Sequence, residues 1–400
     1  MSSAFVCYDP RVSGEKRFRW SVALILFGVL FLGVSDTQLV GPLLPAIAQD
    51  FGTTAGRAGI IVTTYSLAAA AFALLVGPLS DRVGRKKVLV SGLALFTGAS
   101  FLTYHVSSFN ALVIVRAMTG FAAGTLSTCA LSFAGDYYPY EQRGRAMGVL
   151  SMGYFVAFVV GVPAGVIAAS HLGWQWVFGC LSAAAAIMFV IAISGLPIDV
   201  AHAHRGNRNT TFMDHFRKSD RVAGMLAAFL TSGGVVGFLT YVGAWLSTTF
   251  HMGLERIGLV FMVSGLAAAA ASPLSGWLSD HAGKRTVIIW SNLILAVLFV
   301  VVARASLGVG LVLGIAALSI AHSARQAPLH ALTTEIIGPE VRGQYIAVRN
   351  AASQVGIAAV ATFSASAFDA SGFSAVASIA AAVTLLVPLC CVWLREPRVH

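Results

Sequence analysis

The most constraining feature of this chain is a succession of long apolar runs that are almost free of charge. Twelve such runs lie at 20–47, 56–80, 86–107, 108–134, 144–169, 173–196, 222–250, 256–279, 285–304, 307–334, 344–369 and 372–394. A helix needs about 20 mainly apolar residues to cross the hydrocarbon of a bilayer. Only helices and closed barrels satisfy every backbone group there, and these runs are too long and too uniform for alternating strands. The sequence therefore predicts an all-α membrane protein with twelve transmembrane helices.

Composition excludes an ordinary soluble protein. The chain is 57% hydrophobic and 10% charged, whereas roughly a quarter of the residues of a soluble domain are charged. The net charge of +10 does not indicate a nucleic-acid partner, because the position of the basic residues matters more here than their sum. The five cysteines show no CxxC or histidine-paired spacing, so neither a metal site nor a disulfide framework is expected.

The distribution of basic residues predicts the orientation in the membrane. Most Lys and Arg residues lie in the amino terminus, in the loops after each even-numbered run and in the carboxyl terminus. The opposite loops hold only Arg57, Arg256 and Arg304. Because short basic loops stay in the cytoplasm, we expect a multi-pass protein of the cell (inner) membrane with both termini cytoplasmic.

An internal repeat divides the chain into two halves. Gly77, Asp81 and Gly84 recur 199 residues later as Gly276, Asp280 and Gly283, and the same offset relates Gly173 to Gly372. The expected organisation is a cytoplasmic N-terminus at 1–19, a six-helix bundle at 20–196, a cytoplasmic linker at 197–221, a second bundle at 222–394 and a cytoplasmic tail at 395–400. Such duplicated bundles typically enclose a substrate site between them near the bilayer midplane.

The loop after the second run carries the most specific motif, Gly77-Pro-Leu-Ser-Asp81-Arg82-Val-Gly84-Arg85-Lys86-Lys87. This loop resembles the signature loop between helices two and three of the major facilitator superfamily. A glycine lets two helices approach, an aspartate accepts from amides at a helix start, and an arginine pairs with an acid such as Asp136. The predicted conformational latch on the cytoplasmic side comprises Gly77, Asp81, Arg82, Gly84, Arg85, Asp136, Arg143, Asp280, Lys284, Glu335 and Arg342.

Two further motifs carry the resemblance into the spans. The fourth contains Arg116-Ala-Met-Thr-Gly120, similar to the family's RxxxG pattern, and the fifth contains Gly161-Val-Pro163-Ala-Gly165, similar to a motif of the exporter branch. The resemblance covers essentially the whole chain and is strongest to the twelve-helix bacterial drug and sugar efflux branch. It implies two pseudo-symmetric six-helix bundles. Close helix packing through small residues explains Gly161 and Gly165 about equally well.

Ionisable residues inside a span are functional candidates, because an unpaired charge in hydrocarbon is costly. Asp36 and Arg116 lead this group, and their estimated depths in the first and fourth spans agree. An isolated aspartate in low dielectric tends to stay protonated, whereas a nearby arginine favours the ionised form. We therefore expect Asp36 to carry a coupling proton and Arg116 to tune it. A static hydrogen bond of Asp36 near Gly41 and Pro42 is the alternative.

Other side chains are candidates for a substrate cavity. His322, Arg325, Gln326 and His330 share one helix face, which either lines the cavity or forms a polar face near the cytoplasmic end. The remaining candidates are Tyr65, Tyr154, Phe158, Tyr241, Trp245 and Gln354. Simple helix packing explains each of these as well.

The sequence thus predicts a secondary active transporter, a proton-coupled exporter of small amphipathic compounds that works by alternating access. A proton-coupled importer on the same fold is the alternative, because fold does not decide direction. No HExxH, GxSxG or complete phosphate-binding loop is present, so neither an enzyme nor a cofactor is expected. The expected partners are a small-molecule substrate, protons and the lipid bilayer, with the chain acting as a monomer.

Overall fold

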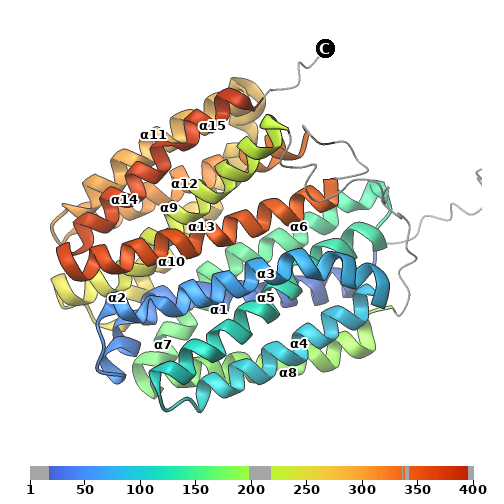
Figure 1. Cartoon of the computed structure of the whole chain (residues 1–400), viewed down its shortest axis with the longest axis horizontal. Helices are drawn as coiled ribbons and strands as arrows, with labels where there is room; N and C mark the ends of the chain where they lie inside the picture. Colours follow the sequence, from blue (N-terminus) through green and yellow to red (C-terminus); the bar gives the residue numbers. More distant parts are fainter. Residues whose placement is uncertain (1–17, 198–217, 336, 338–341, 395–400) are drawn as a thin grey trace, which may run out of the picture.

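The computed structural model describes residues 18–197, 218–335, 337 and 342–394, and the described part of the chain is almost entirely helical (Figure 1). Twelve helical segments in this part are long and apolar enough to cross a membrane. The twelve-helix prediction is confirmed, and the predicted spans differ from the observed ones by only a few residues. The first was expected at 20–47, for example, and the helix runs Trp20–Asp50.

The first half contains α1 (Trp20–Asp50), α2 (Ala55–Ala58), α3 (Ile60–Val83), α4 (Arg85–Tyr104), α5 (Phe109–Tyr137), α6 (Tyr140–Val156), the π-helix η2 (Ala157–Gly161), α7 (Val162–Leu172) and α8 (Trp174–Gly195). The second half contains α9 (Ser219–Phe250), α10 (Leu254–Ala282), α11 (Lys284–Ala303), α12 (Val309–Glu335), α13 (Arg342–Ser371), α14 (Phe373–Leu385) and α15 (Val387–Trp393).

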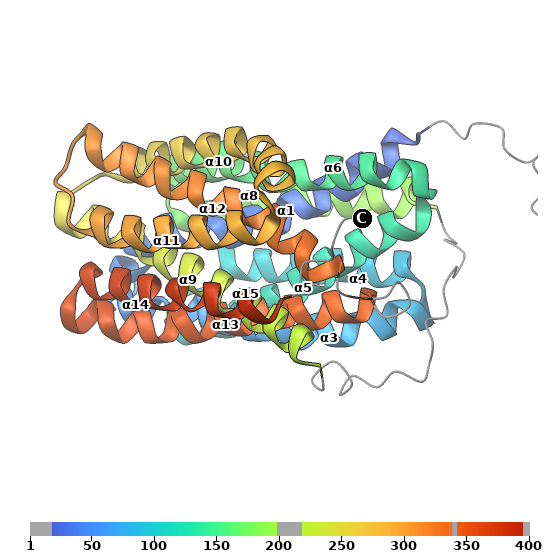
Figure 2. The same ribbon diagram turned by 90° about the horizontal axis from the view of Figure 1, so that it is seen from above.

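The helices lie side by side along the long axis of the molecule and form two bundles, one from each half (Figures 1 and 2). The start of α1 at Trp20 and the end of α15 at Trp393 lie at the same end of the molecule, as an even number of crossings requires. We call this the terminal end. The other end, which carries the turn between α1 and α2, is the opposite end.

The two halves repeat each other in backbone conformation. Six described residues have a positive φ angle: Gly52, Gly84, Gly173, His251, Gly283 and Gly372. They form three pairs, 52 with 251, 84 with 283 and 173 with 372, each separated by 199 residues. The left-handed region suits a tight turn directly after a helix. The sequence offset therefore returns as an equal backbone geometry at equivalent turns.

Helix packing follows the same offset. A Cβ on Gly120 of α5 would collide with the backbone of Tyr65 on α3, so glycine allows these helices to touch. At the equivalent place in the second half, Ser319 of α12 hydrogen-bonds Ser264 of α10 over 2.5 Å. The α3/α5 and α10/α12 pairs thus pack in the same register, as expected for two pseudo-symmetric six-helix bundles. The predicted domain boundaries stay predictions, and 1–17, 198–217 and 395–400 lie outside the described residues.

Hydrogen bonds between the halves gather at the opposite end. The Asp369 side chain on α13 accepts from the Thr54 hydroxyl over 2.7 Å and from the Gly56 amide over 3.0 Å. Between α3 and α13, the hydroxyls of Thr63 and Thr362 lie 3.0 Å apart. Contacts between α7 and α10 add to this set of links across the halves. This structure therefore holds the two bundles together at the opposite end.

Candidate functional site

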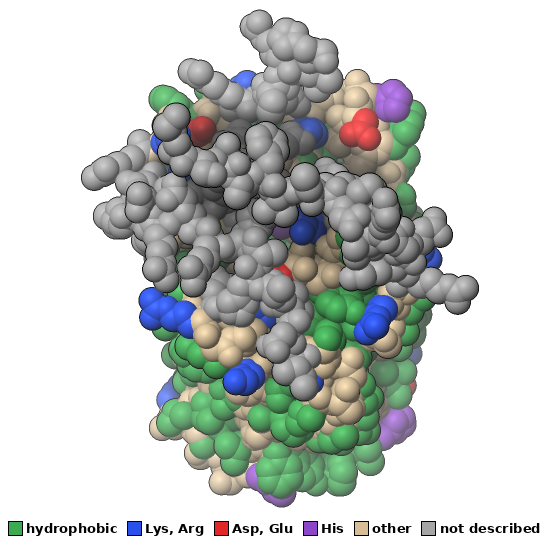
Figure 3. All heavy atoms as spheres, turned by 90° about the vertical axis from the view of Figure 1, so that its right-hand side faces the viewer, with side chains coloured by type: hydrophobic (Ala, Val, Ile, Leu, Met, Phe, Trp, Pro, Cys, Tyr) green, Lys and Arg blue, Asp and Glu red, His purple; other side chains and the backbone are tan. Residues whose placement is uncertain are grey.

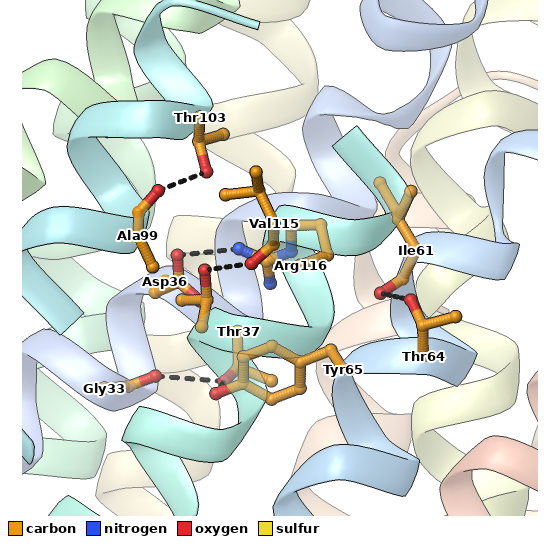
Figure 4. Close-up of polar contacts among 11 residues, drawn as sticks. Gly33, Asp36, Thr37, Ile61, Thr64, Tyr65, Ala99, Thr103, Val115 and Arg116 are labelled. Atoms are coloured by element: carbon orange, nitrogen blue, oxygen red, sulfur yellow. Dashed lines mark hydrogen bonds and ion pairs between the residues drawn. The ribbon is translucent and has the colours of Figure 1, made fainter. Parts of the chain in front are cut away.

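An ion pair inside the first bundle is the most distinctive polar feature of the membrane interior. The Arg116 guanidinium on α5 donates from Nη1 to Oδ1 of Asp36 on α1 over 2.8 Å (Figure 4). The two side chains are 1% and 0% exposed. Asp36 Oδ2 and Arg116 Nε have no hydrogen-bond partner among the described residues. The pair is therefore buried and only partly satisfied, and its proton-coupling role stays a prediction.

Aromatic rings complete the surroundings of Arg116. Its guanidinium carbon lies 4.7 Å from the ring centre of Tyr65 and 5.6 Å from that of Phe178, both distances within cation–π range. The Tyr65 hydroxyl lies 2.7 Å from the Thr37 hydroxyl, and Thr37 in turn donates to the Gly33 carbonyl over 2.9 Å (Figure 4). Tyr65 thus connects α3 to both the charge on α5 and the residue that follows Asp36 on α1.

A cavity of about 270 Å³ lies between the two halves and next to this pair. The first half contributes residues of α1, α3, α5 and α6, and the second half contributes residues of α9 and α13. The lining runs from Gln38 back to Val29 on α1 and from Ile357 back to Asn350 on α13, which is from the middle toward the terminal end. Tyr65 belongs to the lining as well as to the ion-pair surroundings. The Tyr65 ring therefore contacts both the cavity and the Arg116 guanidinium.

Three of the predicted cavity residues line it: Tyr65, Tyr154 and Gln354. The other three aromatic candidates do not line this cavity but pack between helices, and their role as substrate contacts stays a prediction. Phe158 lies against Gly265 of α10. Tyr241 donates to the Ala361 carbonyl over 3.2 Å, and Trp245 stacks on Phe373 with ring centres 4.4 Å apart. Composition alone does not reveal which face of a helix an aromatic residue occupies.

The polar residues His322, Arg325 and Gln326 of α12 also lie outside the lining of this cavity, and their role in substrate binding stays a prediction. Arg325 is 0% exposed, donates to the side-chain oxygen of Asn292 over 2.5 Å and to the Thr231 carbonyl over 3.1 Å, and so joins α12 to α11 and α9. His322 and Gln326 bond to each other over 3.3 Å. These residues connect the helices of the second bundle.

Sequence reasoning missed several residues. Gln38 and Asn350 line the cavity, and Gln38 follows Asp36 by two positions, which is a signal that was available. Arg349 is 5% exposed within the α13 span and bonds Thr333 and His330. Because Arg349 lies only a few residues after the basic loop, the sequence did not distinguish it from the loop residues as a charge inside the membrane.

The signature loop forms the expected ion pair. Arg85, at the start of α4, pairs through Nε with Oδ2 of Asp136 on α5. Arg143 donates to the Tyr138 carbonyl over 3.1 Å, and Lys86 donates to the carbonyls of Ile193 and Leu196, both over 2.6 Å. These contacts join α4, α5, α6 and α8 at the terminal end. Their role as a latch stays a prediction.

Other predicted latch residues are less engaged. Arg82 and Asp280 are exposed, and Lys284 begins α11. Gly84 has a φ of 106°, which explains glycine there. Gly77, in contrast, has no atom of the described residues within 4 Å of the place where a Cβ would lie, so the described part of the chain shows no close helix approach at this residue. The side chains of Asp81, Glu335 and Arg342 lie outside the described part.

The terminal end is rich in basic side chains. Figure 3 shows Lys and Arg on the visible part of this face. The described bases at this end include Arg82, Lys87, Arg145, Lys218 and Arg285. Arg57, Arg256 and Arg304 lie at the opposite end. The asymmetry expected from the sequence is thus present in space.

Comparisons with known proteins agree with this architecture. A solved D-xylose-proton symporter superposes with a TM-score of 0.79 at 16% identity, covering 93% of this chain and 96% of that one. Among curated relatives, the uncharacterized MFS-type transporter YceJ of Bacillus subtilis is 28% identical over 69% of this chain and 71% of its own length. The purine ribonucleoside efflux pump NepI of Escherichia coli is 26% identical over 70% and 71%.

A chloramphenicol resistance protein of Streptomyces lividans is 27% identical over 68% of this chain and 70% of its own length. The family model described as Major Facilitator Superfamily matches residues 26–254 and 224–400. These two ranges together cover nearly all of both bundles, including the buried ion pair and the cavity. The chain is a multi-pass membrane protein that belongs to the major facilitator superfamily.

Proposed function

We propose that this transporter is a proton-coupled exporter of small amphipathic compounds, such as drugs, sugars or metabolites, and that Asp36 carries the coupling proton. The single observation that supports this role is the buried pair of Asp36 with Arg116, in which Arg116 contacts a ring that lines the cavity. A charge in the membrane interior that is only partly satisfied is a functional candidate. Here the candidate lies beside the space that a solute would occupy.

The coupling follows from the contacts of the pair. Protonation of Asp36 removes the carboxylate charge and leaves Arg116 with the rings of Tyr65 and Phe178 as its remaining described contacts. The arrangement of α1 and α5 that the ion pair stabilises then loses its main attraction. A change in the contact between Tyr65 and Arg116 reaches the cavity directly, because the same ring lines it.

Alternating access explains the arrangement of the two halves. In this structure the halves are joined at the opposite end, and the cavity extends toward the terminal end. Transport requires the second state, in which the links at the opposite end open and the terminal end closes. The ion pair of Arg85 with Asp136 and its neighbouring contacts are the proposed latch of that end.

The relatives support export. One is a purine ribonucleoside efflux pump and another is a chloramphenicol resistance protein. A basic terminal end supports cytoplasmic termini in the cell inner membrane, so this state would load solute from the cytoplasm. The proposal includes protons as the energy source, no cofactor, no nucleic-acid partner and a monomeric transporter.

Proteoliposomes with an imposed pH gradient test this function and its direction. In an antiporter, an acidic lumen drives labelled solute inward as protons leave, whereas a symporter needs an acidic exterior. The solutes are labelled nucleosides, sugars and chloramphenicol. We expect uptake with the acidic lumen, and uptake only with the acidic exterior would establish the importer alternative.

The matched variants are Asp36→Asn and Asp50→Asn, which make the same substitution on α1. Asp50 binds Trp174 and Gln175 at the opposite end and lies outside the cavity. Asp36→Asn is expected to abolish pH-driven transport and retain solute binding, while Asp50→Asn retains both. Undiminished pH-driven transport by correctly inserted Asp36→Asn would eliminate Asp36 as the coupling carboxylate.

A further inference from the structure

The lining of the cavity combines apolar side chains with uncharged polar ones and includes no charged residue among those described. Three carboxamides face it, Gln38 from the first half and Asn350 and Gln354 from the second. Hydroxyl groups of Thr37, Ser127 and Tyr154 lie among the others. Three buried charged residues that are close in sequence or contact to the lining, Asp36, Arg116 and Arg349, are themselves absent from it.

The three carboxamides are also without hydrogen-bond partners among the described residues, and each is half-buried. Three other amides in the bundles are bonded to neighbouring side chains. Gln175 bonds Asp50 over 2.8 Å, Gln326 bonds His322, and Asn292 accepts from Arg325. The amides that face the cavity therefore retain their full capacity to donate and to accept.

This pattern discriminates between solute classes. A cation or an anion loses its hydration on entering a membrane-embedded cavity and needs an opposite charge to compensate. The Asp36 carboxylate is 0% exposed and paired with Arg116, which in turn lies against the Tyr65 ring. A purely apolar solute leaves the carboxamides desolvated and unpaired, which is unfavourable. A neutral solute with several donors and acceptors satisfies them.

The volume of the cavity limits the size of the solute. The cavity of about 270 Å³ is slightly smaller than the range of roughly 300–1,000 Å³ found for pockets of drug-sized ligands. The three carboxamides come from both halves, so a solute that bonds all of them connects α1 to α13. Binding of such a solute is then directly sensitive to the relative movement of the halves.

The geometry points to a binding site for a small uncharged solute rich in hydroxyl or amide groups, of the sugar or nucleoside type, held by Gln38, Asn350 and Gln354. This inference rests on the proposed transport function and names the substrate class of the same cavity. Lipophilic cations and carboxylates are poor ligands of this site.

Binding to the purified full-length protein at a single pH tests the site independently of proton coupling. The probes are inosine, adenosine, D-xylose and D-ribose as neutral solutes, tetraphenylphosphonium as a cation and benzoate as an anion. At least one neutral probe is expected to raise the melting temperature, and the two ions are not. Absence of any shift with all four neutral probes, or an equal shift with either ion, overturns the inference.

Variants then assign the contacts. Gln354→Met and Gln38→Met keep the length of the side chain and remove the amide. Each is expected to lower the affinity for the neutral probe at least tenfold. Gln344→Met is the control, since Gln344 lies on the same helix, is exposed and is absent from the lining. Gln354→Glu is expected to lose the neutral probe and to gain binding of tetraphenylphosphonium.

Unchanged affinity in both Met variants overturns the assignment of the carboxamides. The failure of this inference is distinguishable from that of the proposed function. pH-driven transport of tetraphenylphosphonium that depends on Asp36 would support coupling and overturn the substrate class. Binding of a neutral probe without any pH-driven transport would support the substrate class and overturn the proposed proton coupling.

Discussion

The carboxylate of Asp369 in the second half caps the first turn of α2 in the first half. Its Oδ1 accepts from the Gly56 amide over 3.0 Å, and its Oδ2 accepts from the Thr54 hydroxyl over 2.7 Å. A Cβ on Gly56 would collide with Asp369 and with the Ala365 carbonyl, so glycine is what allows this approach. An anionic cap at a helix start is favourable, and this one also holds the two bundles together.

The first prediction concerns this cap. Asp369→Asn removes the charge and one acceptor, and loss of a cap costs about 0.5–2 kcal/mol. The population open at the opposite end is expected to rise by roughly twofold to thirtyfold, since about 1.4 kcal/mol corresponds to tenfold. Spin-label distances between α2 and α13 measure the shift. An unchanged distance distribution would contradict the role of the Asp369 cap in holding the two bundles together. Asp50→Asn provides the control.

The second prediction concerns the stability of the buried pair. Arg116→Ala leaves the Asp36 carboxylate buried without its partner, and breaking a buried pair in this way costs about 3–5 kcal/mol. Thermal unfolding in detergent is expected to show a large loss at neutral pH.

Arg85→Ala is the comparison, since the pair of Arg85 with Asp136 is partly exposed at 18% and 30%. Exposed pairs contribute about 0–1 kcal/mol, so its effect on stability should be much smaller. A double-mutant cycle of Arg116→Ala with Asp36→Asn isolates the interaction between Asp36 and Arg116. A coupling energy near zero between the two positions would refute the pair as a structural contact.

The third prediction separates the two contacts of Tyr65. Tyr65→Phe removes the hydrogen bond to Thr37 and keeps the ring beside Arg116. The cavity wall is expected to lose about 0.5–1.5 kcal/mol of stabilisation. We expect this loss to appear as a KM of transport raised up to roughly tenfold. Tyr65→Leu removes the ring as well and should lower pH-driven transport further. Equal kinetics for the two variants would exclude a role for the ring.

The fourth prediction uses two glycines of the signature loop. Gly84→Ala forces a side chain into a left-handed backbone at φ 106°, which costs about 1–2 kcal/mol. Gly77→Ala meets open space and should leave folded stability unchanged, as should Gly276→Ala at the equivalent position. Melting temperatures of the three variants decide the matter, and a destabilised Gly77→Ala would show a neighbour that this structure lacks.

Sequence reasoning succeeded where the physical demand is local. The hydrocarbon thickness determines the length of each span, and the rarity of intramembrane charge identified Asp36 and Arg116, which the structure brings to 2.8 Å. The loop pairing of Arg85 with Asp136 followed from complementary charge. The span lengths depend on composition along one segment, and each ion pair joins two helices through residues that their charge alone marks as candidates.

The rest depends on how helices rotate about their own axes. Tyr154 faces the cavity and Phe158, four residues later, faces α10. The uniformly apolar spans give no contrast between a face toward lipid and a face toward protein, so periodicity did not assign these aromatics. A π-helical turn at Ala157–Gly161 further changes the phase of this span. Gln38 was missed because the criterion for a functional candidate was a charge inside a span, and an uncharged amide does not meet it.

The paired left-handed turns have a consequence for ancestry. Turn positions at 84 and 283, and at 173 and 372, keep one backbone geometry, as two tandem copies of a single six-helix ancestor would. The helix interiors have diverged, since Asp36 and Arg116 correspond at the same offset to Val235 and Ile315. The buried ion pair of an acid with a base therefore belongs to one copy alone, while the buried arginines of the other copy, Arg325 and Arg349, bond uncharged partners and histidine.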